Sequence, residues 1–513
     1  MSFNVRRLRE EKPKKKIALW KPIALVLLGI GSSVLGLYEH EKERYQERKA
    51  SVHRCNVLKR VLLVLIALLC ALLLVAGTVK ALTSLKILNI GTLTKITGTA
   101  PPHDELGYTN ILLLGQGDEG HDGVNLTDTI MIASIDPERT KSIVMLSFPR
   151  DLYLLGTDKM GKGRLNTMYR DYRSYLRFQK GMEEDEATQE AMKELAAELG
   201  RNIGMQIHHT AKVDFIGFVK AVDIIDGIDV EVPYDIVDKE YPDKEYGFET
   251  FEILAGPQHL DGETALKYAR SRHTTSDFGR SARQQQILAS MAEQAKKKGI
   301  QRDPKKIVSL LKILSENLET TMSIGEMIGL AEIARDIDRS RIVTIQLNDR
   351  NGLYGEITEQ GGFLYTPPRN LFEGASVLLP VSIPEFPVTW KQIKSLVQLL
   401  TNQREVYLAG SEFSVLNSTA RPGTARKLGN ELTRYGFPVI KIENSDSADQ
   451  VSTSISYRDE EDTALAGFFS LLLGVPVIPM PTDLPLEQQS RLTIILGKDF
   501  SFTPIQDLLP NLQ

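Results

Sequence analysis

The stretch KSIVMLSFPRD, residues 141–151, decides the fold. Its apolar and β-branched side chains are typical of a buried β-strand that ends at the proline. Arg150 and Asp151 follow directly, at the place where α/β domains bind ligands beyond their strand ends. Two similar runs precede it, TNILLLG (109–115) and DTIMIASI (128–135), each closed by turn residues. We therefore expect a buried sheet with charged side chains at its strand ends.

Helical segments alternate with these strands. EATQEAMKELAAELG (186–200) has helical composition and a terminal glycine, and DFIGFVKAVDII (214–225) begins with an aspartate suited to an N-cap. IDVEV then continues as a strand. Residues 404–500 alternate again, through EVYLAG, TARKLGNELTRYG, FPVIKIE, DTALAGFFSLLLG and RLTIILG. The sequence predicts a layered α/β (αβα) domain followed by a second, smaller α/β domain.

Composition excludes several classes of protein. The 513 residues are 42% hydrophobic and 25% charged, as in a globular chain of two or three domains. A formal net charge of −4 argues against a general nucleic-acid binder, so we expect no nucleic-acid partner. The two cysteines, Cys55 and Cys70, leave the rest of the chain without a disulfide scaffold or a cysteine metal site.

An uncharged apolar run, residues 61–79, is predicted to be a transmembrane helix, because its 19 residues span about 28 Å. The shorter segment 23–38 reaches about 24 Å and is either re-entrant or interfacial, or a second span. Both the leader before it and the loop 39–60 are basic, which favours the cytoplasm for both. The chain beyond residue 80 is then extracytoplasmic, and a cleaved signal peptide is the weaker interpretation.

The stretch YARSRHTTSDFGRSARQQQ, residues 268–286, concentrates positive charge. We expect its first two arginines in an extended segment and its last two on a helix from Phe278 to Lys298, with Gly299 as its stop. The helix dipole adds positive potential at that end, and guanidinium groups pair bidentately with phosphate oxygens. A pyrophosphate site is one interpretation, and a solvated helix face with surface ion pairs is the other. The arginines are Arg270, Arg272, Arg280 and Arg283, with Asp277 between them.

Seven short motifs occur in a particular order: LLLG, TDT, FPRD, RLN, YARSR, DFGR and ARQQ. Together they resemble the LytR-CpsA-Psr family of cell-wall glycopolymer transferases, over residues 104–382. Residues 404–500 resemble the LytR C-terminal domain often appended to that family. The resemblance implies transfer of a phosphate-linked glycopolymer (teichoic acid, capsule or similar) from a polyprenyl-pyrophosphate carrier. The acceptor is a hydroxyl of peptidoglycan or another envelope glycan, and a pyrophosphatase side activity is an option.

The resemblance also implies roles for individual residues, with Mg²⁺ as the cofactor. The first group comprises four arginines that clamp the pyrophosphate and an aspartate, Asp277, that orients them. A second group adds substrate contacts, and a third holds the metal. The catalytic group is Arg150, Arg270, Arg272, Arg280 and Asp277; the further substrate-binding residues are Gln284, Arg164 and Arg283; the metal ligands are Asp128 and Asp118.

Two positions depart from the family pattern. Gly117 stands where an aspartate is usual, with Asp118 one place late, and Leu126 replaces an arginine. Glu119 or Asp122 are the other loop acids that could complete the metal site. The weakened acidic loop favours a second hypothesis, a non-catalytic polyprenyl-phosphate-binding or envelope scaffold protein, whereas Asp128 and the arginines favour an enzyme. The apolar face of 214–225 suits an ordinary core, with a channel for an isoprenoid tail as the alternative.

These inferences give a membrane-anchored protein of the bacterial cell membrane, with its large C-terminal part outside. The predicted parts are a basic cytoplasmic leader with the short apolar segment (1–56), the transmembrane helix (57–80), a stalk (81–103), the LytR-CpsA-Psr-like domain (104–382), a linker (383–403), the LytR C-terminal-like domain (404–500) and a tail (501–513).

Overall fold

The structure is a computed structural model. It describes residues 99–512 except for 118–124, 244–246, 272–276, 300–316, 324, 328, 331–332, 334–336, 338, 353–356, 358, 447–449 and 479–489. All described residues belong to one compact unit, 58–513. The predicted transmembrane helix and the apolar segment 23–38 lie outside the described residues. Among the helices of the described part, none combines the length and the apolar character needed to span a bilayer.

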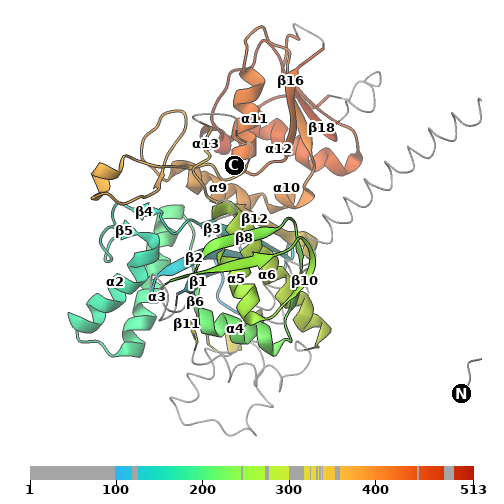
Figure 1. Cartoon of the computed structure of the whole chain (residues 1–513). Helices are drawn as coiled ribbons and strands as arrows, with labels where there is room; N and C mark the ends of the chain where they lie inside the picture. Colours follow the sequence, from blue (N-terminus) through green and yellow to red (C-terminus); the bar gives the residue numbers. More distant parts are fainter. Residues whose placement is uncertain are drawn as a thin grey trace, which may run out of the picture. The chain divides into compact units, whose positions relative to one another are not determined.

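A six-stranded mixed sheet forms the centre of the first domain, with strand order β11-β6-β1-β2-β3-β12 (Figure 1). The three strands predicted from sequence are its middle and pair antiparallel in chain order. β6 runs parallel to β1, and β12 runs parallel to β3. The strands are β1 (Thr109–Gln116), β2 (Thr127–Asp136), β3 (Ser142–Phe148), β6 (His209–Asp214), β11 (Leu318–Thr320) and β12 (Ile342–Gln346).

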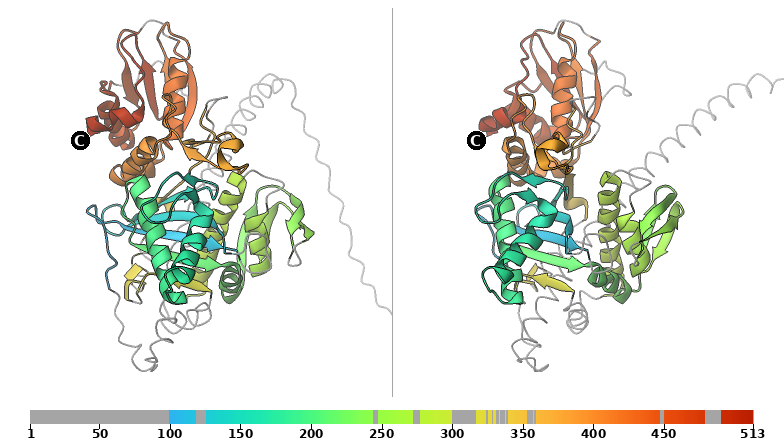
Figure 2. Two further views of the ribbon diagram at one scale, coloured as in Figure 1. Left: turned by 90° about the vertical axis from the view of Figure 1, so that its left-hand side faces the viewer. Right: turned by 60° about the vertical axis from the view of Figure 1, so that its left-hand side comes forward.

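Side chains alternate between the two faces of this sheet, because successive residues of a strand point in opposite directions. Leu112 and Leu114 pack against α2 (Leu165–Phe178) and α3 (Glu184–Ile203). Ile111 and Leu113 face the other core, to which three helices that follow β6 contribute. These are α4 (Phe215–Ile224), α5 (Gly262–Arg270) and α6 (Asp277–Lys297). Figure 2 shows helices on both sides of the sheet, so the layered α/β prediction is confirmed.

Local chemistry explains several helix ends. The Asp214 carboxylate accepts a hydrogen bond from the Gly217 backbone N–H, which caps α4 where the sequence predicted. α3 continues past the expected glycine and ends at Gly204, which adopts the left-handed conformation with φ 74°. Arg270 corrects a prediction, because it is the last residue of α5 and does not lie in an extended segment. α6 begins at Asp277, one residue earlier than expected.

Small antiparallel pairs extend the domain beyond its sheet. Of these, only the IDVEV strand was predicted, because the others are short or lie among turn residues. The pairs are β4 (Tyr153–Leu154) with β5 (Gly163–Arg164), β7 (Ile228–Val232) with β10 (Gly256–Leu260), β8 (Ile236–Pro242) with β9 (Phe248–Ile253), and β13 (Leu364–Tyr365) with β14 (Leu379–Pro380).

The C-terminal part has its own sheet of four strands in the order β16-β15-β18-β17, which agrees with a second α/β domain. EVYLAG is not a strand: it lies in the short helix α10, and the strand follows it. The strands are β15 (Phe413–Asn417), β16 (Val439–Asn444), β17 (Ser454–Tyr457) and β18 (Leu492–Leu496). The helices are α9 (Lys391–Asn402), α10 (Arg404–Ala409), α11 (Thr424–Arg434), α12 (Thr463–Leu473) and α13 (Ile505–Leu508).

Arg404, at the start of α10, connects the C-terminal part to the central sheet. Its side chain is almost fully buried, and its guanidinium lies 3.9 Å from the ring centre of Tyr108. It donates to the Ser134 carbonyl oxygen at 3.1 Å and also to the Ser134 hydroxyl. Burial lowers the pKa of Arg404 to about 10. The Tyr108 hydroxyl donates in turn to the Thr401 carbonyl oxygen at 2.9 Å. A buried, shared polar contact therefore joins the two parts.

Candidate functional site

One end of the central sheet gathers the predicted site residues of the first domain. β2 runs antiparallel to both of its neighbours, with Gln116 opposite Thr127 and Ile130 opposite Phe148. The start of β2 therefore lies beside the ends of β1 and β3. Asp128 comes from that start, and Arg150 follows the end of β3, so residues 22 positions apart meet.

Asp128 and Arg150 form a partly buried ion pair. The Arg150 Nη1 lies 3.1 Å from Asp128 Oδ1, and both side chains are about one quarter exposed (26% and 25%). Asn166, at the start of α2, brings its amide nitrogen to 3.4 Å from the same carboxylate oxygen. The Asn166 backbone N–H donates to the Arg150 carbonyl oxygen at 3.2 Å. The three motifs TDT, FPRD and RLN thus form one cluster.

Arg164 joins this cluster through an acid. Asp151 lies between the two arginines, with Oδ2 3.8 Å from Arg150 Nε and Oδ1 3.5 Å from Arg164 Nη1. Arg164 pairs with Tyr153 across the β4–β5 hairpin, which places it back beside the end of β3. Both guanidinium groups remain partly exposed, so an anion can reach them from solvent.

An apolar pocket opens on the opposite face of the sheet, between the strand ends and helices α4, α5 and α6. It encloses about 760 Å³ of empty space, part of it open to solvent. Phe215 and Phe218 of α4 line it, whereas Val222 is fully buried in the core. The face of 214–225 thus contributes two aromatic rings to a pocket and Val222 to the core, and its role in holding an isoprenoid tail stays a prediction. Arg270 and Gln284 also line this pocket.

Among the described residues that line the pocket, Arg270 carries the positive charge. Its guanidinium stacks 4.4 Å from the ring centre of Phe215 and 5.3 Å from that of Tyr241. Its Nη1 donates to the Tyr241 hydroxyl oxygen at 3.0 Å, and burial raises the pKa of Tyr241 to about 12. No carboxylate in the described residues forms a salt bridge with Arg270. Two aromatic rings thus fix the orientation of a positive charge at an apolar pocket.

The other two arginines of the described cluster are buried. Arg280 is 5% exposed and Arg283 is 3% exposed. Arg283 donates from Nε to the Tyr268 carbonyl oxygen at 2.8 Å, and from Nη2 to the Ser271 carbonyl oxygen. Burial lowers the pKa of Arg283. Its donors thus hold the start of α6 against the end of α5, an arrangement that the sequence did not suggest.

For the remaining predicted site residues, the structure gives fewer contacts or does not describe the side chain. Gln284 lines the pocket and its amide nitrogen lies 3.4 Å from the Ala269 carbonyl oxygen. Asp277 begins α6, but its side chain is not described. Arg272 and the loop acids Asp118, Glu119 and Asp122 lie outside the described residues. The convergence of all four arginines therefore stays a prediction.

The residues around Asp128 fit Mg²⁺ in part. No group of three or more acidic, histidine or cysteine side chains in the described segments could hold a metal ion. The buried Asn166 Oδ1 has no hydrogen-bond partner, however, and Asn166 lies beside the Asp128 carboxylate. Carboxylate and amide oxygens are hard ligands of the kind that Mg²⁺ prefers, and phosphate oxygens can complete such a shell. Asn166 belongs to the RLN motif, which was the signal that could have identified it.

A polar group that the sequence did not identify lies beside β1. Lys212 on β6 is buried, donates to the Gln116 side-chain oxygen at 2.7 Å and lies 3.1 Å from Glu319. Its ammonium also stacks 5.2 Å from the ring centre of Tyr169. Burial raises the pKa of Tyr169. A lysine in a strand offers no sequence signal, because only the pairing of β6 with β1 brings it to the strand end.

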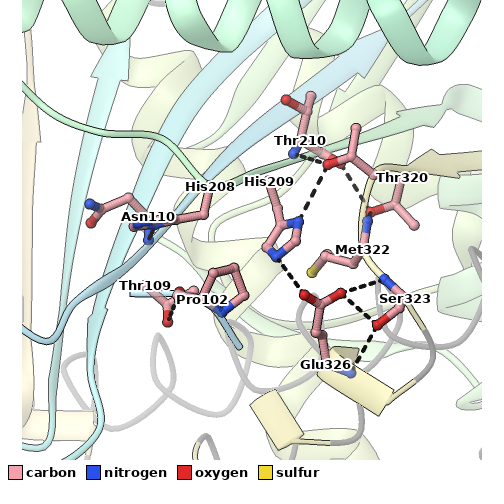
Figure 3. Close-up of polar contacts among 11 residues, drawn as sticks. Pro102, Thr109, Asn110, His208, His209, Thr210, Thr320, Met322, Ser323 and Glu326 are labelled. Atoms are coloured by element: carbon pink, nitrogen blue, oxygen red, sulfur yellow. Dashed lines mark hydrogen bonds and ion pairs between the residues drawn. The ribbon is translucent and has the colours of Figure 1, made fainter. Parts of the chain in front are cut away.

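The adjacent histidines His208 and His209 have different partners (Figure 3). The His208 Nδ1 accepts from the Asn110 backbone N–H at 2.9 Å, which leaves the proton on Nε2. The His209 Nε2 lies 3.5 Å from the Glu326 carboxylate, and that carboxylate accepts from Ser323. Burial lowers the pKa of both histidines. The pair thus belongs to two separate contacts at the start of β6.

Comparison with known proteins defines the class of this α/β chain. Residues 88–369 match the LytR_cpsA_psr family, and residues 412–500 match the LytR cell envelope-related transcriptional attenuator family. The chain belongs to the LytR-CpsA-Psr family and carries a LytR-type C-terminal domain.

Two curated relatives illustrate the similarity. The polyisoprenyl-teichoic acid–peptidoglycan teichoic acid transferase TagV of Bacillus subtilis (strain 168) is 29% identical over 268 residues, 51% of this chain and 59% of TagV. The chain thus spans about three fifths of that relative. The cell wall biosynthesis protein LcpA of Corynebacterium glutamicum is 29% identical over 404 residues, 75% of this chain and 72% of LcpA. The crystal structure of B. subtilis TagV matches with 24% identity and a TM-score of 0.38, covering 57% of this chain and 97% of TagV.

Proposed function

We propose that this protein transfers a phosphate-linked glycopolymer from a polyprenyl-pyrophosphate carrier to a hydroxyl of peptidoglycan or another envelope glycan. The observation that carries the proposal is the apolar pocket with Arg270 on its wall. An isoprenoid chain needs an apolar wall, and its pyrophosphate needs a cation beside it. The name of TagV, a teichoic acid transferase, supports the same reaction class.

The arginines take the phosphate oxygens in this proposal. Arg270 holds the phosphate nearest the lipid, and Arg150 and Arg164 approach from the other face of the sheet. The acceptor oxygen bonds to the phosphorus that carries the glycopolymer, and the bond from that phosphorus to the bridging oxygen breaks. Polyprenyl phosphate leaves, and the hydroxyl proton is released. Fixed guanidinium groups stabilise the charge that develops on the phosphate oxygens without having to reorganise during the reaction.

Mg²⁺ is part of the proposal. Asp128 and Asn166 would hold it, with Asp118 as the proposed further ligand from the adjacent loop. When bound, the ion would neutralise part of the negative charge on the phosphate oxygens. Asp128 then has two tasks, since its carboxylate also orients Arg150.

The proposal places this reaction on the outer face of the bacterial membrane, with residues 61–79 as the anchor. Protease added to intact spheroplasts should digest residues 104–513 and spare the basic loop 39–60. Protection of the large domain would exclude a reaction with envelope glycans.

The full-length protein tests the chemistry in lipid vesicles that contain a polyprenyl-pyrophosphate oligosaccharide. We expect release of polyprenyl phosphate and transfer of the oligosaccharide to peptidoglycan strands across a Mg²⁺ titration. Asp128→Asn should lower turnover about 100-fold or more while lipid binding persists, because the metal contributes several kcal/mol to the transition state. Asp118→Asn should be the most harmful change among the loop acids.

Normal turnover by Asp128→Asn at every Mg²⁺ concentration would contradict the metal assignment. Tight lipid binding without any turnover by the wild-type chain would instead establish a non-catalytic binding protein. Release of polyprenyl phosphate without an acceptor would reveal a pyrophosphatase side activity.

A further inference from the structure

A second cavity lies on the α2–α3 side of the central sheet, away from the apolar pocket. It encloses about 590 Å³ of empty space, part of it open to solvent. The tip of the β4–β5 hairpin, the last turns of α3 and the start of α9 surround it. The side chains that matter are Thr157, Asp158, Glu198, Arg201, Trp390 and Lys394.

One wall of this cavity is fixed by buried charges. Glu194 and Glu198 of α3 are 6% and 1% exposed, and the Arg201 Nη2 contacts both, at 3.1 and 2.8 Å. The Arg201 Nε lies 3.2 Å from the Asp158 carboxylate on the hairpin. The Lys159 backbone N–H donates to Glu198 at 3.0 Å, and its ammonium lies 2.6 Å from Glu194. The hairpin tip is therefore held on α3, and a ligand meets polar groups already in place.

The other wall of this cavity is formed by Trp390 and Lys394. Trp390 is partly buried and packs against the main core, directly before α9. Within the described part of the chain, its indole N–H donates to no acceptor. Lys394, one turn later, is exposed and likewise makes no ion pair with a described residue. An aromatic ring and an ammonium thus face polar side chains that are already held in position.

The balance of charge indicates what such a cavity binds. The cavity carries two acidic side chains, Asp158 and Glu198, and two basic ones, Arg201 and Lys394, so the charges cancel. The apolar pocket differs, because it holds Arg270 beside aromatic rings. A neutral, hydroxyl-rich ligand suits the second cavity: a sugar ring packs its C–H face on an indole and offers hydroxyls to carboxylate, amide and ammonium groups.

The hairpin links this cavity to the arginine cluster. Arg164 and Asp151 lie at its base, and Thr157 lies at its tip. A fully extended chain covers at most about 3.6 Å per residue, so Thr157 lies within about 22 Å of Asp151. We propose that this cavity is a saccharide subsite, which binds a sugar of an envelope glycan and holds that strand near the phosphate site. The identity of the glycan rests on the proposed function, whereas the binding of a saccharide does not.

Trp390 is also the reporter for the test. The chain has two tryptophans, Trp20 and Trp390, so full-length Trp20→Phe protein in detergent emits from Trp390 alone. Solubilised peptidoglycan strands and glycopolymer freed of its lipid are titrated separately. We expect a saturable change in Trp390 emission and protection from acrylamide with one of them. A response to peptidoglycan assigns the subsite to the acceptor, and a response to the free glycopolymer assigns it to the donor.

Variants give a readout that does not depend on fluorescence. Trp390→Ala and Lys394→Ala should each weaken binding of the responding glycan about tenfold, a change of ~1.4 kcal/mol. Lys391→Ala is the matched control on the same helix, because its ammonium faces away to Asp507 at 2.6 Å. If neither polymer alters Trp390, or if both variants bind like the control, the proposal is overturned.

Polyprenyl phosphate release is measured in the same preparation. If polyprenyl phosphate is released but no glycan changes Trp390 emission, the saccharide subsite is wrong and the proposed reaction stands. If a glycan binds but no polyprenyl phosphate is released, the proposed reaction is wrong and the subsite stands.

Discussion

Arg270 and Arg404 are both guanidinium groups stacked on aromatic rings, yet their surroundings differ. Arg404 lies 3.9 Å from the Tyr108 ring centre, is 1% exposed and donates to Ser134 in the central sheet. Arg270 lies 4.4 Å from the Phe215 ring centre, donates to the Tyr241 hydroxyl and lines an apolar pocket. One guanidinium is enclosed by protein partners, and the other lies on the wall of a pocket.

This difference separates a structural arginine from a binding one. A buried guanidinium costs free energy unless the protein supplies acceptors, and both Arg404 Nη atoms donate to backbone or hydroxyl oxygens of Ser134. Arg270 is oriented by two rings, and within the described residues its guanidinium donates to the Tyr241 hydroxyl and forms no salt bridge, so we expect its other donors to take a ligand. Arg283 tests the rule, because the resemblance assigned it to substrate while its donors contact two carbonyl oxygens.

The largest expected effect is on Arg404. Arg404→Ala should lower the free energy of unfolding by about 4 kcal/mol, because it removes charge-assisted hydrogen bonds and a stacking contact in a buried position. Urea unfolding followed by circular dichroism measures it. Arg404→Met is the control that keeps apolar volume, and it should lose less. Wild-type stability in Arg404→Ala would show that the C-terminal part does not depend on this contact.

Arg283→Ala should cost about 3 kcal/mol of stability, since two carbonyl oxygens at the junction of α5 and α6 lose a charged donor. At a temperature where the variant remains folded, its affinity for the polyprenyl-pyrophosphate lipid should match the wild type. Measuring affinity and stability on the same variant distinguishes a structural arginine from a substrate-binding one. A variant that is stable but binds lipid poorly would move Arg283 back to the substrate site.

Arg270→Ala should weaken lipid pyrophosphate binding by about 1.5–3 kcal/mol, the range for charge-assisted contacts, and lower stability by less than about 1 kcal/mol. Arg270→Lys is the matched variant, which keeps the charge but loses the planar fork. Binding to lipid vesicles measures both. Unchanged affinity in Arg270→Ala would show that Arg270 does not bind the lipid pyrophosphate.

The smallest effect concerns pH. Burial places the pKa of His209 below its unfolded value of about 6.5, so the unfolded chain takes up a proton first as pH falls. The stability due to neutral His209 is therefore complete above pH 6.5 and decreases below it. Burial lowers the pKa of His208 as well, while Glu326 counteracts the shift of His209. His209→Gln should reduce the loss of unfolding free energy between pH 7.5 and 5.5, and an unchanged pH dependence would contradict this assignment.

Sequence patterns predicted the three middle strands of the central sheet and helices α3, α4, α6, α11 and α12, because these segments have clear apolar patterns or end signals, but they did not predict α2 or α9. They failed where tertiary contacts prevail over local preference. EVYLAG has strand-like residues, yet it lies in α10, where Arg404 is drawn into the core. Arg270 was expected in an extended segment. It is instead the last residue of α5, and its side chain lines the pocket.

The ordered motifs of the sequence determined the family, the α/β class and the residue types of the site, because short-range spacing and periodicity are written in the chain. Only the tertiary structure decided what each charged group does. Strand pairing brings Asp128 to Arg150 and Lys212 to Gln116, and helix packing encloses Arg283 while leaving Arg270 on a pocket. The physical reason is that a charged group acts through its surroundings: its partners and its burial depend on residues far away along the chain.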